Sequence, residues 1–384
     1  MTEFIKGMDI SSLTEVESLG GAFFDGNVKL DLFDLLKKYN TNSIRLRLWN
    51  NPFSEDGSSY LGGYCDLQSI LKLSERAHMH GMSVLLDFQY SDFWADPGKQ
   101  YKPKAWENLK GLRLEKALYD YTFDTLKHFR DKKILPEYIQ IGNEITNGFL
   151  WPDGKLEPNP NGGARLGFDR LAGLLRSAIK AVREISPLTK IVLHLERSGD
   201  NAIYREWHGH ILVKEHIDCD IIGVSYYVYW HGPIENFASN IKDVQARYKK
   251  PVMLVETSFG FTGEEYETKL KPENFTGLVM TDKKFESLDK KPPYTLSIDG
   301  QNAFMKKLLT TINDLGIIGL YYWEPAWLPL RGSSWASESA IRYIHEIKGV
   351  GNEWANQGLF DYQGHVLPAM KIIKEFKFKG VSSL

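Results

Sequence analysis

Eight short β-branched or apolar segments alternate with eight amphipathic segments along this chain, and the alternation predicts an α/β fold with parallel strands inside and helices outside. Eight of each select a single (β/α)8 TIM barrel. The chain has 384 residues, roughly 130 more than the about 250 such a barrel needs, so we expect long loops at its top face. No repeat or Pro/Ser-rich linker divides the sequence, so residues 1–384 are predicted to form one domain.

The element boundaries follow from periodicity and breakers. The predicted strands span residues 4–10, 43–49, 83–89, 137–143, 190–195, 221–227, 252–258 and 318–323. The predicted helices span residues 30–40, 67–80, 113–133, 168–185, 202–216, 234–248, 300–315 and 368–378. In the segment from Phe168, apolar residues recur about every 3.6 positions until Ser186 and Pro187 end the pattern. The extra length falls mainly into the expected loops at residues 50–66, 90–112, 146–166 and 257–299.

Composition excludes several classes of protein. There are 47 Lys and Arg against 49 Asp and Glu, giving a net charge of −2, so a nucleic acid or anionic membrane partner is not expected. No apolar run is long enough for a membrane-spanning helix. Motifs for nucleotides, for a serine nucleophile or for a metal are absent, and we expect no required cofactor and no catalytic metal, despite His208, His210, His216 and His231.

The carboxyl ends of the predicted strands are unusually polar and aromatic, and a barrel of this type places its site there. The residues at these ends are Asp9, Trp49, Asp87, Asn143, Glu144, His194, Glu196, Tyr226, Tyr227, Glu256, Trp323 and Glu324. Glu144 and Glu256 each arrive as an apolar strand ends. Burial and a like-charged neighbour raise the pKa of such carboxyls, so that one stays protonated while the other ionises. Glycoside hydrolysis requires this pair.

Two arginines are predicted to point into the barrel. Arg45 and Arg47 alternate with leucines, so a strand period of two places both guanidiniums on one face. Either could hold Glu256 ionised, or form a structural ion pair with Asp9 or Asp87. We favour the functional role for Arg45 and leave both readings open for Arg47.

Tryptophans gather beyond the strand ends. They are Trp49, Trp94, Trp106, Trp151, Trp230, Trp323 and Trp327. Indole faces stack on sugar rings, so this set favours a long groove that binds a polysaccharide.

Several sequence blocks resemble glycoside hydrolase family 53, the endo-β-1,4-galactanases. These are KGMDISSL, SIRLRLWNNP, LLDFQYSDFWADPGKQ, YIQIGNEITNGFLWPDGK, GVSYY, VETS and YYWEPAW, in chain order from Lys6 to about Pro368. The resemblance implies an endo-acting, retaining hydrolase of β-1,4-galactan, the backbone of type I arabinogalactan in pectin side chains. Glu144 would be the acid/base and Glu256 the nucleophile of a double displacement.

The resemblance also implies supporting roles. Asn143 would bond the sugar 2-hydroxyl, Arg45 and either Tyr226 or Tyr227 would orient Glu256, and Trp323 would form the floor of the cleaved subsite. In assigning these roles we place Tyr226 with the catalytic support. The candidate substrate-binding residues are Asp9, Trp49, Asp87, Trp94, Trp151, His194, Tyr227, Trp230, Trp323 and Trp327.

Three positions depart from the family pattern. Gln89 replaces the usual His, Val228 the usual Pro, and Glu196 the common Asp. Family relatives often hold calcium in the loop after the seventh strand. Here that loop spans 257–293 and contains Glu264, Glu265, Glu267 and Glu273, without an alternating Asp/Asn/His series, so calcium remains an open expectation.

The implied partner is galactan or galacto-oligosaccharides, and we expect a monomer. A polymer substrate implies a secreted or cell-surface protein whose export signal is missing before Met1, with a cytoplasmic location left open. Two alternatives remain: another β-1,4-glycanase of the same clan, acting on mannan or cellulose, and a non-catalytic glycan-binding barrel.

Overall fold

Eight parallel strands close into a barrel in the computed structural model, which describes residues 3–346 and 349–379. The order around the barrel is β1-β12-β11-β10-β9-β6-β5-β4, and β4 pairs back onto β1. The bounds are β1 Ile5–Asp9, β4 Ser43–Leu48, β5 Ser83–Phe88, β6 Tyr138–Ile141, β9 Lys190–Leu195, β10 Ile221–Ser225, β11 Val252–Glu256 and β12 Gly319–Trp323. All eight predicted strands, and the barrel, are confirmed.

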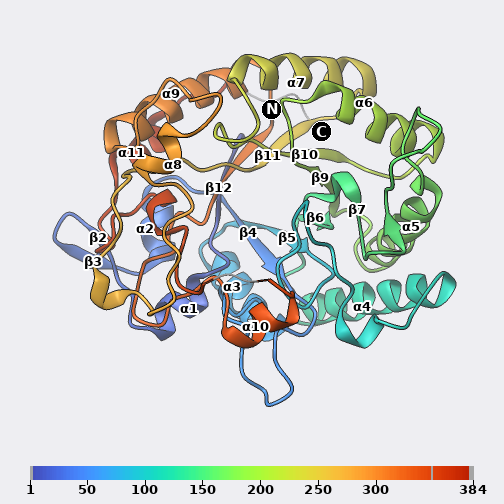
Figure 1. Ribbon diagram of the computed structural model, residues 1–384, viewed down its shortest axis with the longest axis horizontal. Helices are drawn as coiled ribbons and strands as arrows, with labels where there is room; N and C mark the ends of the chain where they lie inside the picture. The colour runs from blue at the N-terminus through green and yellow to red at the C-terminus, as the bar shows by residue number, and fades with distance from the viewer. Residues whose placement is uncertain (1–2, 347–348, 380–384) are drawn as a thin grey trace.

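The predicted helices surround this barrel (Figure 1). They are α2 Leu32–Lys38, α3 Leu67–Met79, α4 Leu112–Asp131, α5 Phe168–Ile185, α6 Asn201–His208, α7 Ile234–Tyr248, α9 Ile298–Asp314 and α11 Pro368–Glu375. A π-helical segment, Gly209–Lys214, continues α6. Side chains of Asp31, Asp66 and Asp200 accept hydrogen bonds from backbone N–H groups of the first turns of α2, α3 and α6, which fixes where these helices begin.

Short elements in the loops were not predicted. They are α1 Leu13–Ser18, α8 Asp282–Glu286, α10 Glu338–Tyr343, the hairpin of β2 Phe23–Asp25 with β3 Val28–Leu30, and the hairpin of β7 Gly148–Phe149 with β8 Gly154–Lys155. Each has seven residues or fewer, too few to display a period. The long segment after β12, residues 324–367, was not among the expected loops, yet it adds α10 and several site residues to the top of the barrel.

The barrel interior is layered. Its lower part is a small apolar cluster that includes Ile5, Val192, Met253 and Tyr321. A Cβ at Gly7 would lie 2.2 Å from the Tyr321 ring, so only glycine lets this ring fill the axis. Above this plug the interior becomes polar, and the polar layer opens into the loops at the carboxyl ends of the strands.

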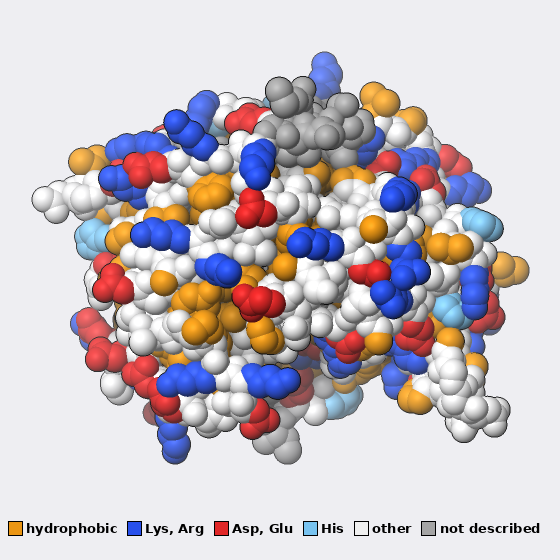
Figure 2. Space-filling view, turned by 90° about the horizontal axis from the view of Figure 1, so that it is seen from above, with side chains coloured by type: hydrophobic (Ala, Val, Ile, Leu, Met, Phe, Trp, Pro, Cys, Tyr) orange, Lys and Arg blue, Asp and Glu red, His pale blue; other side chains and the backbone are white. Residues whose placement is uncertain are grey.

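The surface carries no preference for one charge on the face shown in Figure 2, where Lys and Arg side chains are interspersed with Asp and Glu. This agrees with the net charge of −2. Within the described ranges, no helix is both long and apolar enough to span a bilayer.

Helix α5 offers a direct test of the packing. Leu175 is fully buried on its inner face, whereas Leu188, just beyond the helix, is 89% exposed. Leu175→Ala should lower the free energy of unfolding by about 2 to 5 kcal/mol, because it leaves a cavity in a close-packed layer. Leu188→Ala should change it by less than about 0.5 kcal/mol. Urea denaturation of both variants measures this, and equal values would contradict the assigned face of α5.

Candidate active site

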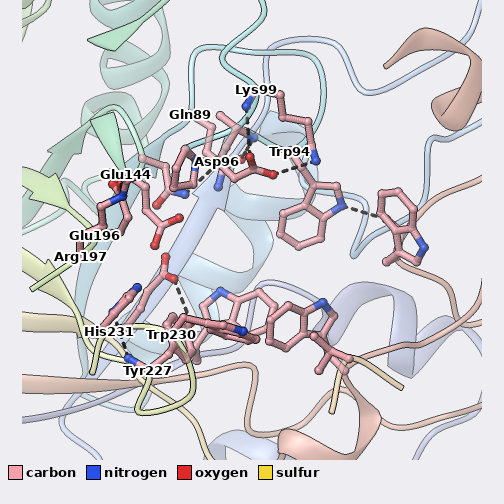
Figure 3. Close-up of a pocket in the computed structure, with 18 of the residues that line it drawn as sticks. Gln89, Trp94, Asp96, Lys99, Glu144, Glu196, Arg197, Tyr227, Trp230 and His231 are labelled. Atoms are coloured by element: carbon pink, nitrogen blue, oxygen red, sulfur yellow. Dashed lines mark hydrogen bonds and ion pairs between the residues drawn. The ribbon is translucent and has the colours of Figure 1, made fainter. Parts of the chain in front are cut away.

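A cavity of about 500 Å³ lies at the carboxyl ends of the barrel strands and contains Glu144 and Glu256 in its wall. Figure 3 shows its labelled side chains converging from several loops. Its wall is formed by Gln89, Trp94, Ala95, Asp96, Pro97, Lys99, Asn143, Glu144, Glu196, Arg197, Tyr227, Trp230, His231, Glu256, Val279, Trp323, Trp335, Glu353 and Trp354. The two glutamates predicted on separate strands therefore share one cavity.

Glu144 follows β6 in a left-handed conformation, with φ 50° and ψ 49°. This backbone conformation is costly for a non-glycine residue, and such strain is typical of functional positions. The Glu144 Oε1 atom accepts a 2.8 Å hydrogen bond from Ser225 Oγ. Burial raises the pKa of Glu144 well above its usual value, and the nearby charges of Glu256 and Glu196 raise it further. Glu144 is therefore suited to hold a proton.

Glu256 is the last residue of β11, and both its carboxylate oxygens are engaged. Arg45 Nη2 lies 2.8 Å from Oε1, and Tyr227 Oη donates a 3.0 Å hydrogen bond to Oε2. Burial raises the pKa of Glu256, while Arg45 and the Tyr227 hydroxyl act in the opposite direction. Glu256 has a cationic partner that Glu144 lacks, so Glu256 is the member of the pair that ionises first.

Arg45 combines the two roles that the sequence left open. Its side chain is 1% exposed and forms ion pairs with Asp9 at 2.6 Å and Asp87 at 2.9 Å in addition to Glu256. It also donates a 2.9 Å hydrogen bond to Asn143 Oδ1. Burial raises the pKa of Asp87 to about 7, although Arg45 opposes this shift. One guanidinium thus links the ends of four strands to the residue before Glu144.

Arg47 has a different partner from those expected. Its Nη1 lies 2.5 Å from Glu324 Oε1, and its guanidinium carbon lies 4.1 Å from the centroid of the Trp94 ring. Asp9, Asp87 and Glu256 are not its ion-pair partners. The Arg47–Glu324 pair lies against the indole of a cavity residue, so Arg47 supports Trp94 rather than the carboxylate pair.

Asn143 and His194 form a second layer around Glu144. Asn143 Nδ2 donates to the carbonyl oxygen of Ala95 at 2.9 Å, and His194 Nε2 lies 2.7 Å from Ser225 Oγ. Burial and the charge of Arg45 hold the pKa of His194 well below its usual value, so the ring is neutral. His194 is fully buried and absent from the cavity wall, and its Nδ1 lies 3.1 Å from Asn143 Oδ1 and 3.4 Å from the backbone nitrogen of Glu144.

Tyr226, assigned from the sequence to catalytic support, does not contact Glu256 in the structure. Its hydroxyl donates to the Gly232 carbonyl at 3.0 Å, and its ring packs against Phe237 of α7. Tyr227 contacts Glu256 instead. Ile221 lies in the interior cluster, and a period of two from it points Tyr227 inward and Tyr226 toward the helices. This signal was present in the sequence.

The other residues predicted to bind substrate fall into two groups, those that line the cavity and those that do not. Asn143, Trp94, Tyr227, Trp230 and Trp323 line the cavity with the two glutamates. Asp9, Trp49, Asp87, His194 and Trp327 are at most 2% exposed and are not part of the cavity wall, so their part in substrate binding stays a prediction. Trp151 lies outside the cavity wall and donates through Nε1 to the Asn147 carbonyl at 3.1 Å. Trp106 packs against Tyr121 in the core.

Sequence reasoning missed part of the cavity wall. Trp335, Trp354, Glu353, Asp96, Lys99 and Arg197 were not named as candidates. Trp335 and Trp354 come from the segment after β12, and Trp94 Nε1 donates to the Trp335 carbonyl oxygen at 2.9 Å. Gln89, one of the three departures, also lines the cavity, and its Oε1 accepts from Trp49 Nε1 at 2.7 Å. The tryptophan count alone could have drawn attention to positions 335 and 354.

Among the described residues, the sole set of His, Cys, Asp or Glu atoms close enough to hold an ion is Asp31, Asp34 and His80, and none of the three belongs to the cavity wall. In the loop after β11, where calcium was an open expectation, Glu265 pairs with Lys271 at 2.6 Å and Glu267 with Lys269 at 2.6 Å.

Of the histidines named from the sequence, His231 lines the cavity, and burial lowers its pKa to about 4.

Comparison with known proteins identifies the family. The glycosyl hydrolase family 53 pattern matches residues 5–373. An endo-β-1,4-galactanase of Bacillus subtilis is 34% identical over 396 residues, covering 97% of this chain and 86% of the relative. An arabinogalactan endo-β-1,4-galactanase of Cellvibrio japonicus is 33% identical over 382 residues, covering 97% of this chain and 91% of the relative.

Solved structures agree. The family 53 catalytic domain of Ignisphaera aggregans superposes with a TM-score of 0.85 at 36% identity, covering 97% of this chain and 95% of that one. A fungal β-1,4-galactanase structure superposes with a TM-score of 0.74 at 25% identity, covering 98% of this chain and 100% of that one. The resemblance noted from the sequence blocks is confirmed, and the chain belongs to glycosyl hydrolase family 53.

Proposed function

We propose that the protein is an endo-acting, retaining glycoside hydrolase that cleaves β-1,4-galactosidic linkages in galactan. The observation that carries this proposal is the pair of carboxyls in one cavity. Among the described residues Glu144 has no cationic partner and its pKa is strongly raised, while Glu256 is bound by Arg45. The substrate follows from the relatives, two of which are named as endo-β-1,4-galactanases.

The chemistry divides into two displacements. In the first, a Glu256 oxygen bonds to the anomeric carbon as the glycosidic bond breaks, and Glu144 gives its proton to the departing oxygen. In the second, water attacks the same carbon, Glu144 takes the proton of that water, and Glu256 leaves as a carboxylate. Two inversions give overall retention. Glu144 must start protonated and Glu256 ionised, the order that burial and Arg45 favour.

Neighbouring groups position this pair. Arg45 and Tyr227 fix the two oxygens of Glu256 and stabilise its charge. Asn143 Oδ1 accepts from Arg45, and one hydrogen of its amide goes to the Ala95 carbonyl. The second amide hydrogen is suited to the 2-hydroxyl of the sugar, because Asn143 lines the cavity beside Glu144.

Tryptophans extend the cavity into a sugar-binding groove. Trp323 and Trp354 lie with ring centroids 4.8 Å apart, and Trp94, Trp230 and Trp335 line the same wall. Trp230 is 47% exposed, a large apolar surface left open at the cavity. Such faces suit the apolar sides of galactose units along a polymer. Trp323, the last residue of β12, forms the floor where cleavage occurs.

We assign the whole chain to one catalytic barrel, since one core cluster includes residues from Phe4 to Ile373. All groups of the mechanism come from one chain, so a monomer suffices. A polysaccharide is too large to import intact, and the protein therefore acts outside the cell or at its surface.

A parallel substrate assay tests the function. Release of reducing ends should be at least about tenfold faster on β-1,4-galactan than on mannan or carboxymethylcellulose. Preference for mannan or cellulose would identify another β-1,4-glycanase. Binding of galactan without release of reducing ends would identify a glycan-binding barrel.

The nucleophile can be tested by an isosteric change. Glu256→Gln should lower the rate on galactan by at least about 10⁴-fold, since an amide does not form the covalent intermediate. Calorimetry should still detect galacto-oligosaccharide binding. Glu265→Gln, a matched change in the surface pair with Lys271, should keep normal activity. Near-normal turnover by Glu256→Gln would refute its role.

The two tyrosines should differ in pH dependence. A plot of wild-type kcat/KM against pH should be bell-shaped. It should fall at low pH because Glu256 gains a proton, and at high pH because Glu144 loses one. Tyr227→Phe removes a hydrogen bond that lowers the pKa of Glu256. The midpoint of the acidic side of the profile should therefore shift to higher pH by about one unit.

Tyr226→Phe is the matched control, because the Tyr226 hydroxyl bonds to Gly232 and not to a carboxylate. Its acidic limb should coincide with that of the wild type. Equal shifts in both variants would show that the Tyr227 hydroxyl does not stabilise the charge of Glu256.

A further inference from the structure

Glu196 is a third buried glutamate in the cavity, and the mechanism above does not use it. It follows β9, lines the same cavity as Glu144, and is 3% exposed. Among the described residues, neither of its carboxylate oxygens has a hydrogen-bond partner of good geometry. Looser contacts with Thr146 and with its own backbone N–H act only to lower its pKa. Arg197 Nε lies 3.5 Å from Oε1, but the Arg197 side chain is 51% exposed and oriented for an ion pair only.

Burial without well-formed hydrogen bonds is unusual for a carboxylate. A buried carboxylate that accepts no hydrogen bond loses the hydration it had in water and regains little. Burial raises the pKa of Glu196, although contacts with Thr146 and the charge of Arg197 oppose this shift. A carboxylate held in this way against a substrate cavity has up to four lone pairs available, and sugar hydroxyls are the donors that a glycan would bring to them.

The position of Glu196 indicates which sugar it meets. Figure 3 shows Glu196 and Arg197 beside Glu144, across the cavity from Trp94. Glu144 protonates the departing oxygen, so the leaving part of the chain lies on its side. The cleaved sugar lies over Glu256, Tyr227 and Trp323. Glu196 therefore faces the leaving group.

We propose that Glu196 binds the sugar on the leaving-group side of the cleavage point, accepting hydrogen bonds from its hydroxyls, and so makes the enzyme select a sugar there. This inference rests on the proposed function and adds the residue that recognises the leaving unit. The same place receives an incoming sugar in the second displacement. The acceptor hydroxyl oxygen then bonds to the anomeric carbon, the ester bond to Glu256 breaks, and Glu144 takes the hydroxyl proton.

Partition of the covalent intermediate provides the test. The donor is nitrophenyl β-1,4-galactobioside, whose leaving group has no sugar hydroxyl, and the acceptor is methyl β-galactoside. Transfer yields a methyl trisaccharide and hydrolysis yields galactobiose. Both routes use Glu144 as the base, so their ratio does not depend on the protonation of Glu144, which Glu196 also influences.

Glu196→Ala should lower the ratio of transfer to hydrolysis by about tenfold or more, whereas the rate of nitrophenol release should change far less. Glu196→Gln keeps the volume and one acceptor oxygen and should give an intermediate ratio, which covers the case in which the alanine variant does not fold. Glu196→Asp should recover part of the loss. Glu265→Ala removes a carboxylate from a surface pair with Lys271, outside the cavity wall, and should leave the ratio unchanged.

An unchanged ratio in both Glu196→Ala and Glu196→Gln would overturn the inference while leaving the proposed function intact. Absence of sugar transfer by the wild type would overturn it as well. If the wild type cleaves neither galactan nor the nitrophenyl donor, the proposed function itself fails, and the inference with it.

Discussion

A single buried cation, Arg45, is the interaction on which the active end of this barrel depends. Three carboxylates on three other strands, Asp9, Asp87 and Glu256, lie within 2.9 Å of its guanidinium. Arginine does not deprotonate in proteins, so the charge that offsets these acids is permanent. Leaving even one of these carboxylates buried and unpaired would cost several kcal/mol. The ends of the strands are therefore held together by charge above an apolar plug.

The same distribution of charge separates the roles of the two glutamates. Arg45 contacts Glu256 and not Glu144, while Glu144 faces the charges of both Glu256 and Glu196. One carboxyl is thus stabilised as an anion and the other as an acid, although both are buried glutamates at strand ends. The difference between their protonation states follows from the position of the Arg45 guanidinium. Glu196 fits this scheme, since its charge favours protonation of Glu144 and its oxygens, paired only with the exposed Arg197 side chain, can accept from a sugar.

Strand β4 connects the buried carboxylates to the aromatic side of the cavity. Arg45 and Arg47 point inward two residues apart, one toward the carboxylates and the other toward the rim. At the rim, Arg47 pairs with Glu324 and lies against Trp94, and Trp94 bonds to the backbone of Trp335. The aromatic wall is thereby anchored to the strand that also carries the cation of the catalytic pair.

The sequence by itself determined the eight strands, the faces of the helices, the inward direction of both arginines and the two glutamates at the cavity, because these depend on local periods and on strand ends. A period of two also contained the choice of Tyr227 over Tyr226. Tertiary structure alone decided that Arg47 pairs with Glu324, that Trp49 and Trp327 lie behind the wall, and that Trp335 and Trp354 complete it. Trp49 is covered by Gln89, Phe93 and Trp94 from the loop after β5, and the other outcomes depend on how the segment after β12 folds over the barrel. Contacts between residues far apart in the chain produce no periodic pattern in the sequence.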